Sequence, residues 1–298
     1  MERSSRPDVL FGPYGTVLED RGRVLGIADL HDPLKLLEGG VYRDETIATA
    51  RGYAAVADVA TTNAYRLRTL LRSGDVQLYR EAVEAHHSAV LEALNGQRKR
   101  LFHAVGGTFD GSYDPDNAPS AEEAKDFHAE QLATAKGLLG IEVVLFETIN
   151  TSREALGIAL AARESGVPVI LSFVIDKQGD LLSGEGLADS IARIDAASGS
   201  YPIGYSLNCC PVEGIWPAIS ESNGQRGRII GAYPNSSSAD PRTFDESDGI
   251  IHLPDHNVRA AELGSMAKAH RDLNFVGGCC GFDHAAVEAL SRGIKSDK

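Results

Sequence analysis

The chain has 298 residues, of which 43% are hydrophobic and 24% charged, and its formal net charge is −13 at pH 7. This length fits one α/β barrel, and the composition is typical of a folded globular protein rather than a disordered one. The negative charge argues against a nucleic-acid partner, which requires a basic face. The sequence contains no apolar run long enough to span a bilayer and no signal-peptide core, so we expect a cytoplasmic protein with no membrane partner. The sequence gives no indication of its oligomeric state.

Short apolar, β-branched runs recur along the chain with helix-like stretches between them, which is typical of repeated βα units and a parallel sheet. In chain order we predict strands at residues 9–12, 56–62, 101–107, 141–147, 168–174, 203–209, 228–233 and 274–279. Apolar periodicity predicts one helix over residues 121–139 and another that begins at Ser152 and stops near Gly166. Eight such units predict an α/β fold of the (β/α)8 TIM-barrel type, as a single domain over residues 1–298. An open doubly wound sheet is the alternative.

Two stretches rich in Ser, Asp, Pro and Gly, residues 111–120 and 236–248, each follow a predicted strand. In a barrel they would be βα loops at the C-terminal face, where active sites lie.

The four cysteines occur as two vicinal pairs, each after an apolar run. Cys209 falls at the end of the predicted sixth strand, and Cys279 and Cys280 fall at the end of the eighth, so we expect them to face one basin. Three thiolates on one Zn²⁺ leave a fourth tetrahedral position open, which is the arrangement of a catalytic zinc. A substrate thiol bound there would be a thiolate near neutral pH and a nucleophile for alkyl transfer.

Two other interpretations of these pairs stay open. Free cysteines are often buried and inert. Gly277, Gly278 and Gly281 could instead form a phosphate-binding loop after the last strand. The Cys-x-x-Cys spacing that thioredoxin-like exchange requires is absent.

Six short motifs accompany the cysteines along the chain. They are Gly12-Pro13-Tyr14-Gly15-Thr16, Thr62-Asn63-Ala64-Tyr65, Phe146-Glu147-Thr148, Asn208-Cys209, Tyr233-Pro234-Asn235 and Gly277-Gly278-Cys279-Cys280-Gly281. With these motifs in this order, the chain resembles the homocysteine S-methyltransferase family along nearly its whole length. Members of that family are zinc-dependent (β/α)8 barrels.

The resemblance implies a homocysteine-binding barrel that holds Zn²⁺ through Cys209, Cys279 and Cys280. It also implies that Glu147 is the catalytic-site carboxylate and binds the amino group of the substrate. The remaining residues expected to line the substrate pocket are Asn208, Asn63, Gly12 and Thr16. Cys210, the fourth thiol, is expected to pack away from the metal.

The function that the resemblance implies is transfer of a methyl group from a sulfonium or quaternary ammonium donor to a thiol, with homocysteine giving methionine as the expected case. Phe11 stands where the family usually has an Asp that helps to bind homocysteine, so the same chemistry on another thiol is an alternative. A non-catalytic zinc- or thiol-binding barrel, and a lyase or aldolase that uses Glu147 as a base, are further alternatives. Tyr14, Phe109 and Tyr113 could present aromatic faces to a methylated cation.

Overall fold

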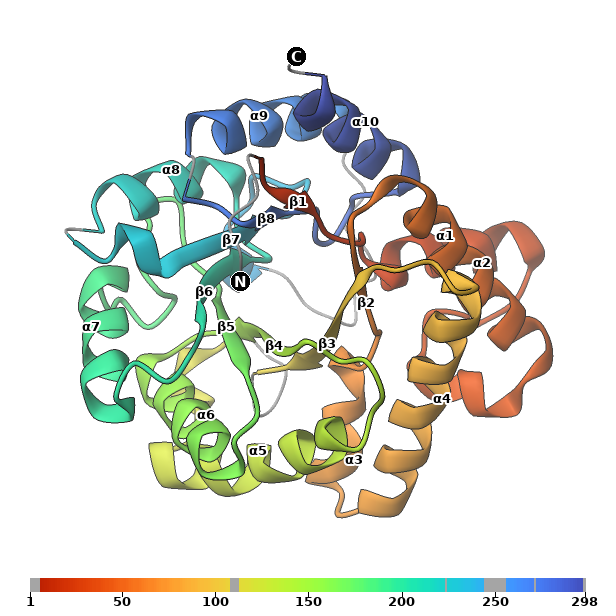
Figure 1. Cartoon of the computed structure of the whole chain (residues 1–298), viewed down its shortest axis with the longest axis horizontal. Helices are drawn as coiled ribbons and strands as arrows, with labels where there is room; N and C mark the ends of the chain where they lie inside the picture. Colours follow the sequence, from red (N-terminus) through yellow and green to blue (C-terminus); the bar gives the residue numbers. More distant parts are fainter. Residues whose placement is uncertain (1–5, 108–112, 223, 244–255, 271, 297–298) are drawn as a thin grey trace.

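The computed structural model describes residues 6–107, 113–222, 224–243, 256–270 and 272–296, and Phe109 lies outside them. Eight parallel strands surrounded by helices form a (β/α)8 barrel, which confirms the predicted fold class (Figure 1). The strands are β1 Asp8–Val9, β2 Val59–Thr61, β3 Arg100–Gly106, β4 Val143–Ile149, β5 Val169–Phe173, β6 Gly204–Asn208, β7 Ile229–Tyr233 and β8 Phe275–Val276.

The strands follow one another around the ring in the order β1-β8-β7-β6-β5-β4-β3-β2. The ring closes between β1 and β2 through an isolated parallel bridge that joins Leu10 to Val59. Beside this bridge the Phe11 N–H donates to the Val59 carbonyl at 3.0 Å, and the Asp58 N–H donates to the Val9 carbonyl at 2.7 Å. These contacts make the sheet a barrel rather than the open doubly wound alternative.

Helices cover the outside of the ring (Figure 1). They are α1 Tyr14–Leu25, α2 Gly40–Val56, α3 Arg68–Arg72, α4 Val76–Leu94, α5 Ala121–Lys136, α6 Ser152–Ser165, α7 Leu187–Ser198, α8 Val212–Ser220, α9 His256–Ala269 and α10 His284–Lys295. Short 3₁₀ turns are η1 Pro33–Glu38, η2 Tyr65–Leu67, η3 Pro115–Asn117, η4 Arg226–Arg228 and η5 Pro241–Thr243. Within the described residues, no helix combines the length and the apolar character needed to span a bilayer.

All eight predicted strands are present in the predicted order, but several of their ends differ. Strand β2 starts at Val59 because α2 continues through Val56, and β4 continues past Glu147 to Ile149. Strand β8 stops at Val276, ahead of the glycine turn. Helix α5 ends at Lys136, three residues before the predicted end, where Gly137 caps it.

Helix α6 begins at Ser152 as predicted. The side chain of Thr151 caps it by accepting a hydrogen bond from the Glu154 N–H. The helix ends at Gly166, whose left-handed φ of 72° allows the chain to turn away.

Side chains of the strands alternate between the barrel interior and the layer under the helices. On β4, Val143 and Leu145 belong to the interior cluster, together with Leu10, Val59, Phe102, Ile170, Ile230, Tyr233 and Phe275. Val144 and Phe146 belong to the larger outer cluster, which packs the sheet against the helices. By this alternation Glu147 continues the interior face and points toward the C-terminal end of the barrel.

Candidate active site

A cavity of about 180 Å³ opens where β1, β2, β4, β6, β7 and β8 end. Every residue predicted for the site lines it except Asn208. These lining residues are Gly12, Thr16, Asn63, Glu147, Cys209, Cys279 and Cys280. The cavity therefore brings together residues that are as much as 268 positions apart in the chain.

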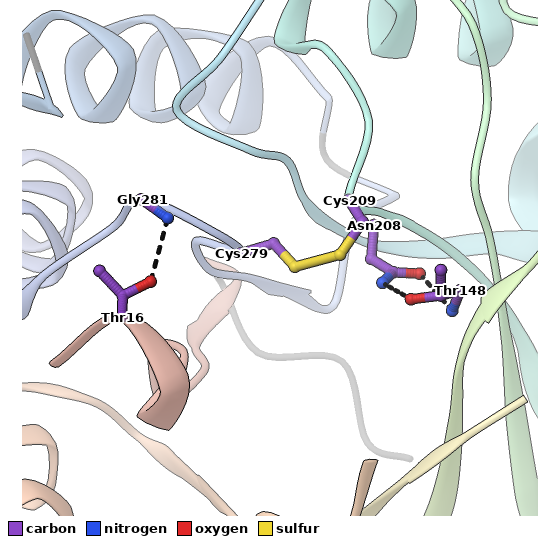
Figure 2. Close-up of a disulfide and its surroundings, with 6 residues drawn as sticks. All are labelled: Thr16, Thr148, Asn208, Cys209, Cys279 and Gly281. Atoms are coloured by element: carbon purple, nitrogen blue, oxygen red, sulfur yellow. Dashed lines mark hydrogen bonds between the residues drawn. A yellow bond between two sulfur atoms is a disulfide. The ribbon is translucent and has the colours of Figure 1, made fainter. Parts of the chain in front are cut away.

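The sulfur atoms of Cys209, Cys279 and Cys280 lie within 4.8 Å of one another. Figure 2 shows Cys209 and Cys279 joined as a disulfide, with their Cα atoms 5.6 Å apart. When reduced, the three side chains supply three thiolates at the wall of a cavity, which fits a zinc ion with one coordination position left for a ligand. Disulfide and thiolate ligand set are alternative states of the same sulfurs.

Cys209 reaches this cluster because the chain turns sharply after β6. The side chains of Tyr205 and Leu207 belong to the outer cluster, and simple alternation would send Cys209 outward as well. Instead Cys209 adopts a left-handed φ of 48° and packs with Val174 beside the cavity. Cys210 is then fully buried in the outer cluster, and burial raises the pKa of its thiol to about 12.

The glycines around Cys279 and Cys280 allow neighbouring side chains and backbone to pack closely against this turn. A β-carbon on Gly278 would overlap the ring of Phe282. Gly281 has a left-handed φ of 83°, and its N–H donates to Thr16 Oγ1 at 3.0 Å (Figure 2). The N–H groups of Gly277 and Cys279 also bond inside the protein, to the carbonyls of Ala232 and Pro234. Three amides of this run are therefore occupied, which does not fit a loop that binds phosphate through its backbone.

Glu147 is followed by a β-bulge. The pairing of β4 with β5 shifts register between Phe146 and Ile149, and Thr148 has a left-handed φ of 65°. The bulge returns Ile149 to the outer cluster, whereas Glu147 and Thr148 both line the cavity. Bulges often re-aim side chains next to active sites.

Asn208 stabilises this bulge from the neighbouring side of the barrel. Its Oδ1 accepts from the Thr148 N–H at 3.0 Å, and its Nδ2 donates to Thr148 Oγ1 at 2.9 Å (Figure 2). Asn208 is 1% exposed and lies behind the cavity wall rather than on it. One amide thus connects the residue after Glu147 to the residue before Cys209.

The Glu147 carboxyl sits in a weakly solvated environment. Burial raises its pKa to about 8, against the lowering effect of the nearby Tyr233 hydroxyl. Ligand-free protein therefore carries Glu147 largely protonated at neutral pH.

The fold agrees with comparisons against known proteins. The profile of the family described as homocysteine S-methyltransferase matches residues 9–294. The chain belongs to this family.

Two relatives illustrate how far the family likeness extends. "Homocysteine S-methyltransferase 1" of Brassica oleracea var. italica is 26% identical over 198 residues, which cover 64% of this chain and 57% of that protein. The chain thus matches little more than half the length of this relative. The Arabidopsis thaliana protein of the same name is 27% identical over 198 residues, which again cover 64% of this chain and 57% of that protein.

Among solved structures, the metallated form of the homocysteine methyltransferase MmuM from Escherichia coli superposes with a TM-score of 0.73. The two chains are 21% identical over 96% of each. At this identity the superposition supports the barrel fold.

Other residues that line the cavity come from the segments after β1 and after β3. Phe11 lines the cavity and packs its ring 5.8 Å from that of Tyr53 on α2. A β-carbon on Gly12 would come within 2.6 Å of the Tyr53 ring, so any other residue there would have to displace that buried ring. Tyr14 and Tyr113 both line the cavity, as the sequence suggested.

Of the further residues that line the cavity, sequence reasoning named Tyr233 and Thr148 only as parts of motifs and did not name Arg66. Tyr233 is the last residue of β7 and faces Glu147, and that position at the C-terminal rim of a strand was the available signal. The left-handed Thr148 has no local signal, because β-branched residues rarely adopt that conformation.

Proposed function

We propose that the protein is a zinc-dependent thiol S-methyltransferase built as a single barrel domain. The expected acceptor is homocysteine, giving methionine, and the expected donor is a sulfonium or quaternary ammonium compound. The observation that carries this proposal is the cluster of three cysteine sulfurs within 4.8 Å at the wall of a cavity that also contains Glu147. The proposal requires a reducing compartment such as the cytoplasm, where Cys209 and Cys279 are thiols.

Cys209, Cys279 and Cys280 would hold the zinc. Bound zinc lowers the pKa of a coordinated thiol, so that the acceptor is a thiolate near neutral pH. The Asn208–Thr148 contact holds the backbone next to Glu147, whose carboxyl lies near the Tyr233 hydroxyl, and Glu147 orients the polar end of the acceptor. The rings of Tyr14 and Tyr113 line the same cavity and favour a methylated cation over neutral ligands.

Methyl transfer is a single displacement at carbon. The acceptor sulfur forms a bond to the methyl carbon with its own electron pair. The bond from that carbon to the donor sulfur or nitrogen breaks, and its electron pair stays on the donor atom, which becomes neutral. The acceptor's thiol proton leaves to solvent. Holding the two reactants in line within one small cavity supplies much of the rate.

The same chemistry on a different thiol is the second candidate. It is favoured by Phe11, which contributes no charge, and by Glu147 being the single carboxylate among the described lining residues. An acceptor that lacks the amino group of homocysteine would suit a cavity whose described lining has a single carboxylate.

The deciding experiment is metal analysis of purified, reduced protein, followed by mass spectrometry of homocysteine incubated with candidate donors. We expect one zinc per chain and a methylated thiol with at least one donor. Cys209→Ala should lose zinc and activity, whereas the matched control Cys210→Ala, which removes the buried thiol next to it, should keep the zinc. Full zinc content and full activity in Cys209→Ala would disprove the assignment.

A further inference from the structure

The described lining of the cavity is unevenly charged. Glu147 supplies its one carboxyl group, whereas Arg66 supplies a guanidinium and His31 an imidazole. Arg66 is exposed, so it lies on the solvent side of the cavity, and no ion pair to it is formed by the described residues. A cation at the edge of a small cavity that forms no ion pair with the described residues is available to a negatively charged ligand.

The backbone that carries Arg66 is firmly placed. Arg66 belongs to η2, directly after the bridge that joins Ala64 to Val105 on β3. Arg68, which is 1% exposed, donates to the Tyr65 carbonyl at 2.6 Å and stacks on the Tyr65 ring at 4.2 Å. Arg68 fits there because the position beside it is Gly106, where a β-carbon would come within 2.6 Å of its side chain.

Arg66 therefore places positive charge at the edge of the cavity on the β2 side, while Arg68 is packed in the core beside it. The three cysteines, which follow β6 and β8, mark the part of the same cavity where a thiol would be held. A ligand that spans the cavity has its sulfur at one end and its remaining charged group near Arg66.

We infer that Arg66 recognises a carboxylate of the acceptor, so that the cavity selects mercapto-carboxylates by their acid group rather than by their amino group. This inference rests on the proposed function, because it names the acceptor class of the same site. Guanidinium pairs with carboxylate through two parallel hydrogen bonds, which gives direction as well as affinity. The amino group, by contrast, has Glu147 as its one carboxyl partner in the described wall.

The test compares three thiols that differ by one charged group: homocysteine, its deamino analogue and its decarboxy analogue. Binding of each to zinc-loaded, reduced protein is measured by calorimetry, without any methyl donor. We expect the deamino analogue to bind within about threefold of homocysteine. The decarboxy analogue should bind about tenfold more weakly, the usual effect of losing one hydrogen-bonded charge.

Variants assign the effect to one side chain. Arg66→Gln should weaken binding of the two carboxylate thiols by about tenfold and leave binding of the decarboxy analogue unchanged. Arg66→Glu should make the decarboxy analogue bind more tightly than the carboxylate thiols. Arg98→Gln is the matched control, because Arg98 is equally exposed but precedes β3 at the opposite end of the barrel, and it should change nothing.

The outcomes separate this inference from the proposed function. If thiols bind but the decarboxy analogue binds as tightly as the deamino analogue, the acceptor class is wrong and the methyltransferase proposal stands. The same conclusion follows if Arg66→Gln leaves the carboxylate thiols unaffected. If no thiol binds zinc-loaded protein, both fail.

Discussion

Asn208 binds Thr148 with both ends of its side-chain amide, at 3.0 and 2.9 Å. The two residues lie on β6 and β4, and each is next to a proposed site residue, Cys209 or Glu147. Both Thr148 and Cys209 have left-handed backbones, so this pair holds two unfavourable turns in place at once.

Asn208→Ala should therefore reduce both stability and activity. It leaves the buried Thr148 N–H without an acceptor, which lowers the free energy of unfolding by about 1–3 kcal/mol. A small displacement of Glu147 should reduce kcat by about 100-fold. Urea unfolding and methyl-transfer assays check the two effects. Thr148→Val removes only the hydroxyl contact and should have the smaller effect on both, and wild-type kcat in Asn208→Ala would contradict the positioning role.

Gly278→Ala should destabilise the cysteine turn. Its added methyl group meets the Phe282 ring in the core, and overpacking of this kind lowers stability by about 1–3 kcal/mol. Gly293→Ala in α10 is the control, because a β-carbon there meets nothing within 4 Å and alanine favours the helix by up to about 1 kcal/mol. Thermal unfolding should shift in opposite directions for the two variants, and equal shifts would refute the packing argument.

The raised pKa of Glu147 makes stability depend on pH. The folded protein holds this proton more tightly than the unfolded chain, so stability is greatest below pH 4.5 for this group and declines as the pH rises toward 8. Glu147→Gln removes the decline. In chelator-treated protein we expect the variant to be more stable than wild type by an amount on the order of a few kcal/mol above pH 8. A pH-independent difference in urea unfolding would contradict this.

Three buried histidines, His86 and His87 on α4 and His103 on β3, should make the protein sensitive to acid. Burial lowers the pKa of His103 to about 3 and that of His86 to about 4, and their mutual proximity lowers that of His103 further. Because the unfolded chain takes up protons first, stability falls as the pH drops below 6.5 toward these values. His103→Gln should lose less stability than wild type between pH 7 and pH 5. An identical loss in urea titrations would exclude His103 as a contributor.

The strand order and the residues that gather at the site were readable from the sequence. Parallel strands buried on both faces appear as apolar runs, such as the one that ends at Phe146, and their carboxyl ends meet at one face. That logic brings Glu147, Cys209 and Cys279 together without any knowledge of side-chain geometry.

What could not be read were the turns that aim these residues. Nothing local distinguishes Cys209 from Cys210, and alternation alone would have sent Cys209 outward; the left-handed turn reverses this. The placement of Asn208 behind the cavity wall likewise depends on its contact with Thr148, 60 positions away in the chain. Such long-range contacts override local preference and have no signature in the surrounding sequence.

The seam between β1 and β8 has a consequence for the order of events during synthesis. Thr16 comes from the first helix, Cys209 from the turn after the sixth strand and Cys279 from the segment after the eighth. The Gly281 N–H donates to Thr16 and so joins that last segment to the first helix. A growing chain on the ribosome presents one of the three clustered thiols until its last strand emerges. The proposed zinc site is therefore complete only after the barrel closes. Zinc binding would then be a measure of how much of the newly made chain has folded into a complete barrel.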